Sequence, residues 1–379
     1  MAINNHFDVI IIGGGLAGLA ASIQLKNAGF TVALFEKEQY PFNKVCGEYI
    51  SLESWAFIES LGLHLTPLQL PIINKLLVTA PNGAALQQAL PLGGFGISRF
   101  LLDESLKNIA VQIGVQLFEN CKVASATFSN NQFTVKANAI FYTSIICLGS
   151  FGKKSNLDVT WRRPFILNKN NALNNYIGVK YHIQTNQAVD TIALHNFKDG
   201  YCGVSKIEKN KYCLCYLTNA ANLKNNDNSI LKMEKNVLYK NPYLKNILTN
   251  CVHLFAQPIT ISQISFSKKN NVQQHILLMG DAAGMITPLC GNGMSMALHS
   301  SKITALLVIS FLQQKIDRPT LEKQYATIWQ ANFGKRLWYG RLIQKFFGKV
   351  WLTNIFIAAL RRMPTITNWL IKQTHGKPF

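Results

Sequence analysis

The stretch VIIIGGGLAGLAASIQLKNAGFTVALFEKE, which runs from Val9 to Glu38, decides the fold. Residues 7–12 form a continuous apolar run rich in β-branched side chains, which is typical of a buried parallel strand. Residues 16–26 then place their apolar side chains at helical spacing, and residues 31–37 form a second apolar strand. This strand–helix–strand unit predicts a nucleotide-binding domain built on a parallel sheet.

Three glycines in the first turn of this unit follow the Gly-x-Gly-x-x-Gly spacing of dinucleotide-binding proteins. Gly13 permits the tight turn, Gly15 lets backbone approach a pyrophosphate, and Gly18 lets the helix pack on the strand. The free N–H groups at the start of the helix face the phosphates. An acid at the end of the second strand accepts hydrogen bonds from a ribose diol, which argues against a 2′-phosphate. The predicted binding residues are Gly13, Gly15, Leu16, Ala17, Gly18, Glu36 and Lys37.

A second segment distinguishes FAD from NAD. The stretch ILLMGDAAGMITPLCGNGMSMALHS, Ile276–Ser300, is an apolar strand followed by Gly-Asp and by a loop that opens a helix. It resembles the Gly-Asp segment of FAD enzymes of the glutathione-reductase-like class, in which the Asp binds the ribityl chain and the loop presents N–H groups to the flavin ring. Donors at a helix N-terminus also stabilise negative charge on a reduced flavin. The resemblance implies FAD contacts from Gly280, Asp281, Pro288, Gly291, Asn292 and Gly293.

Two further stretches indicate the family. KVCGEYIS, Lys44–Ser51, resembles the Cys-Gly-Glu segment of geranylgeranyl-reductase-type flavoproteins. ISRFLLDESL, Ile97–Leu106, is similar to the Arg-x-x-x-Asp segment shared by those reductases, flavin-dependent halogenases and aromatic hydroxylases, in which the Arg helps to hold the FAD phosphates. The resemblance implies cofactor contacts from Cys46, Arg99 and Gly149. Two interpretations stay open for Cys46, a place beside the flavin and an inert packing role. The Arg99–Asp103 pair is alternatively a solvated surface pair.

The order of these motifs predicts a discontinuous α/β fold. A Rossmann-type FAD-binding domain of the glutathione-reductase-like kind is expected from residues 1–75, 96–150 and 270–330. A substrate domain with an inserted antiparallel sheet is expected from residues 76–95 and 151–269, because residues 75–90 alternate around Pro-Asn-Gly and residues 179–217 alternate between polar turns. Residues 331–379 are expected to form a basic helical C-terminal extension.

The charge balance indicates an anionic partner. The chain has 379 residues with 38 Lys and Arg against 18 Asp and Glu, for a net charge of +20. Nucleic acid, an acidic lipid surface and a phosphorylated cofactor are candidates, and a general Lys- and Asn-rich bias is the alternative. No nucleic-acid-binding module occurs and the basic residues are spread along the chain, which argues against nucleic acid.

The cysteines and the N-terminus suggest the cellular setting. The eight cysteines match no zinc-ligand spacing, so we expect reduced thiols and no metal site. The N-terminus lacks the features of a signal peptide, and no apolar run reaches about eighteen residues. We therefore expect a cytoplasmic protein, or one that is peripheral at the inner face of the membrane.

The C-terminal segment 334–379 interleaves Lys and Arg with Trp, Phe, Leu and Ile at helical spacing. A basic amphipathic helix of this kind is typical of a membrane-surface segment that delivers a lipidic substrate. The alternative is a helix packed on the body of the protein with its cations in water.

The motifs are specific for the cofactor but not for the substrate. CLGSFGKK, Cys147–Lys154, carries Leu148 where aromatic hydroxylases carry the acid of an Asp-Gly pair. Residues 199–217 lack the Trp and Phe-Pro of the reductases' Tyr-x-Trp-x-Phe-Pro motif, and the halogenases' Trp-x-Trp-x-Ile-Pro motif is absent. No general base is assigned, since lone residues such as His182, His195 and Glu208 are more often structural.

The resemblance implies an FAD-dependent oxidoreductase that acts on a hydrophobic, aromatic or isoprenoid small molecule. The reaction would be double-bond reduction or oxygen-dependent hydroxylation, with NADPH or NADH as the candidate electron donor. A halogenase-like enzyme and a non-catalytic flavoprotein electron carrier that docks on a membrane remain the alternatives.

Overall fold

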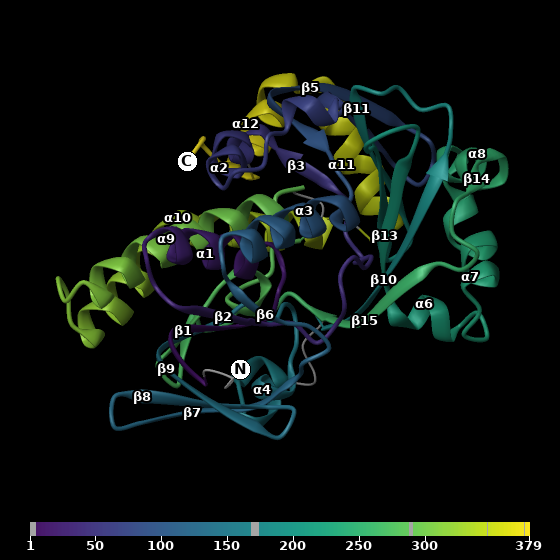
Figure 1. The fold of residues 1–379 in the computed structure, drawn as a ribbon. Coiled ribbons are helices and arrows are strands. Elements are labelled where there is room, and N and C mark those ends of the chain that lie inside the picture. Colours follow the sequence, from purple (N-terminus) through teal and green to yellow (C-terminus); the bar gives the residue numbers. More distant parts are fainter. Residues whose placement is uncertain (1–4, 168–173, 288–290, 347, 375) are drawn as a thin grey trace.

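The computed structural model describes residues 5–167, 174–287, 291–346, 348–374 and 376–379. Two sheets organise the chain (Figure 1). The first sheet contains β1 (His6–Ile12), β2 (Val32–Phe35), β6 (Gln116–Phe118), β7 (Val123–Ser129), β8 (Gln132–Ala137), β9 (Ile140–Gly149), β16 (Val272–Gln273) and β17 (Ile276–Leu278). Its strands follow the order β16-β17-β9-β1-β2-β6. The hairpin β7–β8 is attached to this sheet because β8 also pairs with β9.

The centre of the first sheet is parallel. β1 pairs in parallel with β2 and β9, and β9 pairs in parallel with β17. Helices α1 (Leu16–Asn27), α3 (Arg99–Gln112) and α9 (Gly293–Leu312) lie on one side of it, and the β7–β8 hairpin and α4 (Asn156–Thr160) lie on the other (Figure 1). The predicted strand–helix–strand unit is confirmed, and the strand and helix expected in residues 276–300 join the same layers.

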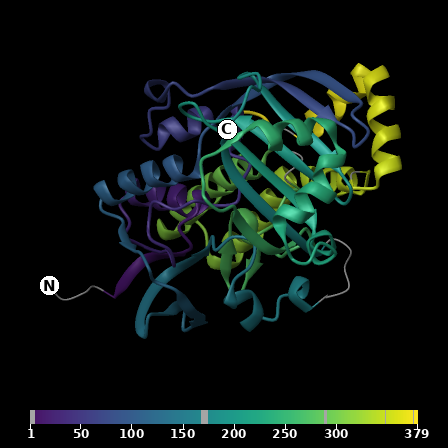
Figure 2. The same cartoon turned by 90° about the vertical axis from the view of Figure 1, so that its right-hand side faces the viewer.

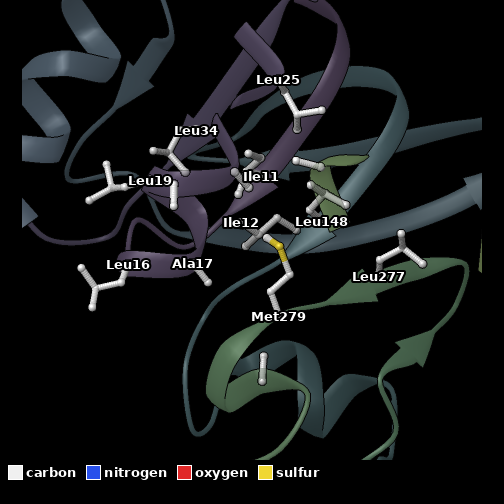
Figure 3. Packing of buried hydrophobic residues seen from close by; sticks show 14 of the residues in the cluster. Ile11, Ile12, Leu16, Ala17, Leu19, Leu25, Leu34, Leu148, Leu277 and Met279 are labelled. Atoms are coloured by element: carbon white, nitrogen blue, oxygen red, sulfur yellow. The ribbon is translucent and has the colours of Figure 1, made fainter. Parts of the chain in front are cut away.

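Close packing between these layers explains why the N-terminal strands are so apolar. Ile10 and Ile11 of β1 are fully buried. Leu148 and Leu277 contribute from neighbouring strands to the same cluster as Ile11 (Figure 3). Each such side chain contributes about 1.5–3 kcal/mol when it leaves water. Helix α1 is buried along most of its length because α3 and α9 pack beside it.

The second sheet is mostly antiparallel. It contains β3 (Tyr49–Ser51), β4 (Ile72–Thr79), β5 (Ala85–Gly96), β10 (Asn174–Gln184), β11 (Thr191–Phe197), β12 (Gly200–Lys206), β13 (Tyr212–Asn219), β14 (Val252–His253) and β15 (Ile259–Ser265). The strand order is β14-β10-β13-β12-β11-β4-β5-β3, with β15 beside β10. The hairpin expected around Pro-Asn-Gly is confirmed as β4–β5.

Two details of the second sheet differ from an inserted, purely antiparallel layer. β11 pairs in parallel with β4, and the two strands come from separate parts of the chain. β3 pairs with β5 although it lies in the segment 1–75 that was assigned to the first domain. Helices α6 (Ala220–Lys224), α7 (Ile230–Asn236) and α8 (Pro242–Asn250) cover the outer side (Figure 1).

Short elements connect the layers. They are α2 (Trp55–Ser60), α5 (Pro164–Leu167) and the 3-10 turns η1 (Leu52–Ser54), η2 (Thr66–Leu68), η3 (Leu238–Lys240) and η4 (Gly280–Ala282). Within the described residues, α9 alone has the length and apolar composition of a membrane span, and half of its most apolar window is buried. Since α9 packs against α1 and α10, we interpret it as a core helix.

The C-terminal helices are α10 (Arg318–Phe346), α11 (Val350–Arg362) and α12 (Pro364–Thr374). The yellow C-terminal segment lies at one edge of the molecule in Figure 2. The boundary predicted at residue 331 falls inside α10. Tyr325, Trp329 and Phe333 form a continuous buried stripe of this helix, so it belongs to the core from its first turns. Ile357 and Leu360 of α11 pack on the second sheet, beside Val78 and Leu86.

Candidate functional site

The turn after β1 and the first turn of α1 each have one position, Gly13 and Gly18, with room for glycine alone. A Cβ atom on Gly18 would lie 2.1 Å from the carbonyl oxygen of Gly13 and 2.6 Å from Oγ of Ser150. Gly13 adopts φ +105°, and a Cβ there would lie 2.6 Å from the carbonyl oxygen of Ser150. These approaches press the start of α1 against the ends of β1 and β9, as the glycine spacing predicted.

The start of α1 forms a positively charged surface. No side chain caps the helix at Gly15, so the N–H groups of its first turn, including those of Leu16 and Ala17, are free of an intrahelical partner. A Cβ on Gly15 would lie 3.9 Å from Nζ of Lys44 and 4.0 Å from Nη2 of Arg99. Helix dipole and two cations therefore converge on one point, which suits a phosphate group.

A buried carboxylate orients the two cations. Asp103 accepts two hydrogen bonds of 2.7 Å from the Arg99 guanidinium, and its carboxylate forms an ion pair of 3.1 Å with Nζ of Lys44. Burial alone would raise the pKa of Asp103, but Arg99 and Lys44 outweigh burial and keep the pKa below its usual range. One negative charge against two positive charges leaves a surplus cation for a ligand. Asp103 is 1% exposed, so the surface-pair interpretation does not apply.

Glu36 lies buried at the end of β2, as predicted. Its carboxylate accepts hydrogen bonds from the backbone N–H groups of Gly14 at 2.9 Å and Glu38 at 3.1 Å. Tyr40 donates its hydroxyl to the carbonyl oxygen of Gly14 on the same turn. Lys37 does not join this group, because its side chain is 65% exposed and lies 3.5 Å from the carboxylate of Glu38.

The second segment reaches the same place from the far end of the sequence. Gly280 adopts φ +56°, and a Cβ on it would lie 3.5 Å from Cβ of Ala17. Burial raises the pKa of Asp281, opposed by the charges of Lys269, Arg99 and Lys153. Gly149 sits at the end of β9, where a Cβ would lie 2.5 Å from Leu278 of β17. β9 and β17 therefore bring the two predicted segments together.

The loop before α9 approaches the Cys-Gly-Glu segment. Gly291 adopts φ +65°, and a Cβ on it would lie 3.2 Å from the Tyr49 ring. Asn292 is the N-cap residue of α9, and Gly293 begins the helix. The predicted residue Pro288 lies outside the described residues. The helix start thus faces the residues that follow Cys46, where the flavin-ring contacts were expected.

Sequence reasoning missed a buried charge cluster around Glu48. Its carboxylate accepts hydrogen bonds from Nζ of Lys180 at 2.5 Å and from the backbone N–H of Arg99 at 2.7 Å, and it lies 2.6 Å from Nε2 of His182. Glu48 is fully buried and adopts φ +55°. This carboxylate therefore joins the start of α3 to strand β10 of the second sheet.

The Glu48 cluster includes a set of atoms at metal-ligand spacing. The carboxylate of Glu48, the His182 ring and the Cys213 thiol lie within 4.8 Å of one another. Lys180 already neutralises one carboxylate oxygen, and its ammonium group repels a cation. The arrangement is better explained as a buried ion pair with its hydrogen bonds than as a metal centre.

Two side chains of the second sheet donate hydrogen bonds to the backbone at Cys46 and Gly47. Cys213 donates its thiol to the carbonyl oxygen of Cys46 at 3.2 Å, and Ser205 donates its hydroxyl to that of Gly47 at 3.1 Å. Burial raises the pKa of the Cys46 thiol, despite the nearby Arg99 charge. The thiol is therefore protonated at neutral pH, and the seven cysteines within the described residues are free.

His195 and Glu208 have structural partners. His195 lies 2.9 Å from Oγ1 of Thr79, and burial lowers its pKa to about 4. Glu208 accepts hydrogen bonds from the backbone N–H and the hydroxyl of Ser98, both at 2.8 Å, and so supports the start of α3. Of the three residues considered as acids or bases, His182 alone contacts the Cys-Gly-Glu segment within the described structure.

These residues fit FAD. The uncapped α1 start with Lys44 and Arg99 suits the pyrophosphate, and buried Glu36 suits a ribose diol. A family model described as FAD binding domain matches residues 8–42, the unit that carries these groups. The chain is an FAD-dependent oxidoreductase.

Relatives align with this flavoprotein over most of its length. Digeranylgeranylglycerophospholipid reductase of Methanococcus vannielii is 20% identical over 386 residues, which cover 91% of this chain and 88% of the relative. Conditioned medium factor receptor 1 of Dictyostelium discoideum is 24% identical over 372 residues, covering 86% of this chain and 68% of the relative.

Solved structures show the same α/β fold with mixed sheets. A flavin-dependent brominase aligns with a TM-score of 0.77 at 18% identity, covering 97% of this flavoprotein and 93% of the brominase. A geranylgeranyl bacteriochlorophyll reductase-like protein from Thermoplasma acidophilum aligns with a TM-score of 0.76 at 16% identity, covering 99% of this chain and 97% of that protein.

Removing the Arg99 charge is expected to weaken FAD binding. Charge-assisted hydrogen bonds contribute about 1.5–3 kcal/mol each, so Arg99→Gln should raise the Kd for FAD by about ten- to a hundredfold. Quenching of FAD fluorescence on binding measures the constant. Lys107→Gln is the matched control, since Lys107 lies on the same helix and pairs with Glu104 at 3.0 Å. An unchanged Kd in Arg99→Gln would place the phosphates elsewhere.

Proposed function

We propose that this oxidoreductase saturates carbon–carbon double bonds in an isoprenoid lipid or a related hydrophobic molecule. The observation that carries the proposal is the placement of the Cys-Gly-Glu residues, Cys46 to Glu48, beside the predicted cofactor cluster, where strands β10 and β13 of the second sheet bind them. This segment resembles that of geranylgeranyl reductases. The Methanococcus relative, which is named for reduction of a geranylgeranyl lipid, aligns with nearly the whole chain.

Within this proposal the fold belongs to the glutathione-reductase-like arrangement of FAD-binding and substrate layers. FAD, when bound, supplies a two-electron carrier that exchanges hydride with a substrate carbon. Arg99 and Lys44 bind its phosphates, and Glu36 accepts hydrogen bonds from its ribose. Glu48 positions the segment 44–48 through Lys180 and His182, and the second sheet excludes water behind it.

We further propose that NADPH or NADH supplies the electrons and that the protein works at the cytoplasmic face of a membrane. Helix α11 exposes Trp351 and Ile355, at 64% and 60%, and α12 exposes Ile366 and Trp369, at 48% and 50%. Segment 334–379 contains no Asp or Glu, and its basic residues are Lys335, Arg336, Arg341, Lys345, Lys349, Arg361, Arg362, Lys372 and Lys377. Exposed Trp beside basic residues is typical of helices that lie on anionic membranes.

Anaerobic turnover tests the proposed reaction. The FAD-loaded protein, reduced with NADPH or with dithionite, is mixed without oxygen with a geranylgeranyl glycerophospholipid in vesicles. We expect the flavin absorbance to recover and mass spectrometry to show two added hydrogens for each double bond reduced. The fully saturated lipid is the control and should leave the flavin reduced.

The alternatives give different products. Reoxidation that requires oxygen, with an added oxygen atom in an aromatic substrate, would establish a hydroxylase. Transfer of bromide or chloride to that substrate would establish a halogenase, whose fold this chain shares. Either outcome would contradict double-bond reduction as the function.

A further inference from the structure

A large cavity lies apart from the cofactor cluster. It measures about 650 Å³ and lies between α10, residues 283–285 after η4, and residues 267–269 after β15. None of the residues predicted to bind FAD lines it. Its size falls in the range of small-molecule sites, which span roughly 300–1,000 Å³.

The cavity wall is positively charged. Lys268 and Lys335 are exposed, Arg341 is half-buried, and Lys269 is almost fully buried. No acidic side chain is among the described residues that line it. Cations gathered on a concave wall attract anions more strongly than the same charges on a flat surface.

Arg341 is the cation best placed to bind a ligand. Burial lowers its pKa, and in the described part of the chain its guanidinium has neither a hydrogen bond nor an ion pair. By contrast, Lys269 donates to the carbonyl oxygens of Lys153 at 2.7 Å and Asp281 at 2.8 Å. A guanidinium that is partly withdrawn from water without a counter-charge gains from a carboxylate or phosphate.

The cavity is also lined by apolar residues, and one of them continues onto the surface. Trp329 and Leu337 are buried at the cavity, and Trp338, which also lines it, is 54% exposed. The Trp338 ring lies 4.9 Å from the Tyr339 ring, which lies 5.8 Å from the Trp369 ring of α12. An aromatic path therefore runs from the cavity to the surface that we propose faces the membrane.

We propose that this cavity is a binding site for an anionic amphiphile. The anionic head contacts Arg341 and Lys335, and the apolar chain follows Trp338 toward Trp369. A free phosphate ion offers the same head chemistry, but it would leave the aromatic path without an occupant. Only one part of this assignment rests on the proposed function, namely that the amphiphile enters from the membrane-facing surface.

Calorimetric titration of the FAD-loaded protein tests the site. The probes are dihexanoyl phosphatidylglycerol below its micelle concentration, dihexanoyl phosphatidylcholine and inorganic phosphate. We expect phosphatidylglycerol to bind at least about tenfold more tightly than either of the others, because losing a charge-assisted contact or the apolar chain costs about a factor of ten or more. Phosphate binding as tightly as phosphatidylglycerol would identify a phosphate site and overturn the proposal, and so would equal binding of phosphatidylcholine.

Two cavity variants and one control variant locate the binding. Lys335→Gln/Arg341→Gln should weaken phosphatidylglycerol binding by about tenfold or more. Arg162→Gln/Lys323→Gln removes the same charge from exposed positions outside the cavity and should change affinity less than about twofold. Ala331→Trp, at an exposed lining position, fills the cavity from its edge without removing a charge and should also block binding. Unchanged affinity in both cavity variants overturns the proposal.

The same samples separate this inference from the proposed function. Flavin content and anaerobic turnover with the isoprenoid lipid are measured beside the titrations. Turnover without selective phosphatidylglycerol binding would refute the cavity site alone. Selective binding without turnover would refute double-bond reduction and leave the site established.

Discussion

The Gly18→Val variant is expected to purify without FAD and with a lower unfolding temperature. A Cβ at this position would lie 2.1 Å from the carbonyl oxygen of Gly13 and 2.6 Å from Oγ of Ser150. The Gly13 carbonyl cannot yield easily, because it is a backbone atom directly after the central strand β1, which pairs with β9. Helix α1 must move instead, which costs at least about 1–3 kcal/mol and shifts the N–H groups of its first turn.

The ratio of flavin to protein absorbance measures FAD content, and thermal unfolding measures stability. Gly203→Ala is the matched control, because a Cβ on Gly203 of β12 would meet its nearest atoms at an ordinary contact distance of 3.7 Å, and Gly203 is not among the residues predicted to bind FAD. That variant should retain FAD. A Gly18→Val protein with full FAD content would show that the start of α1 does not bind the cofactor.

Removing the charge of Glu48 is expected to destabilise the protein strongly. In Glu48→Gln the fully buried Lys180 loses its counter-charge, and breaking a buried pair in this way costs about 3–5 kcal/mol. The amide also cannot accept from His182, Arg99 and Lys180 together as the carboxylate does. Urea unfolding at neutral pH measures the loss.

The pH dependence separates this effect from simple packing damage. In the native protein, Lys180 and His182 outweigh burial and lower the pKa of Glu48, and Glu48 outweighs burial and raises the pKa of Lys180. Stability from Glu48 is present above its unfolded pKa of about 4.3 and is lost as pH falls through the lower folded value. Stability from Lys180 is present below about pH 10.4 and is lost as pH rises through the higher folded value.

In Glu48→Gln the pKa of Lys180 shifts on folding in the opposite direction. Burial without a counter-charge puts its folded pKa below the unfolded value, so the variant should gain stability as pH rises toward about 10. The difference in the free energy of unfolding between native and variant protein should therefore become smaller at alkaline pH. Glu48→Leu/Lys180→Met removes both charges and should recover part of the loss. A difference that is constant across this range would contradict the ion-pair explanation.

The cofactor half of the site could be predicted because its signals are local. Gly13 and Gly18 follow from a turn whose geometry excludes other residues, and Glu36 follows from the length of one strand–helix–strand unit. Asp281 was found because a strand, a Gly-Asp pair and a helix start lie together in sequence. In the structure the Gly280–Asp281 turn and the start of α1 lie close together, since a Cβ on Gly280 would lie 3.5 Å from Cβ of Ala17.

The Glu48 cluster could not be predicted in the same way. Lys180 and His182 come from a strand more than a hundred residues away, and the register that aligns them with Glu48 depends on the whole second sheet. One signal was present: both polar residues alternate with apolar Val179 and Tyr181, so they share one face of β10. Nothing in that alternation identifies the partner that the face meets.

The discontinuous first sheet also constrains biosynthesis. β1 and β9 come from the first half of the chain, whereas β17 and the Gly280–Asp281 turn come from the last third. A growing chain thus exposes the glycine turn long before its partner segment leaves the ribosome, and such non-local pairing is slow to form. A site built from both segments is therefore complete only after residue 293 and the start of α9 have been synthesised, so we expect stable FAD binding to follow translation of most of the chain.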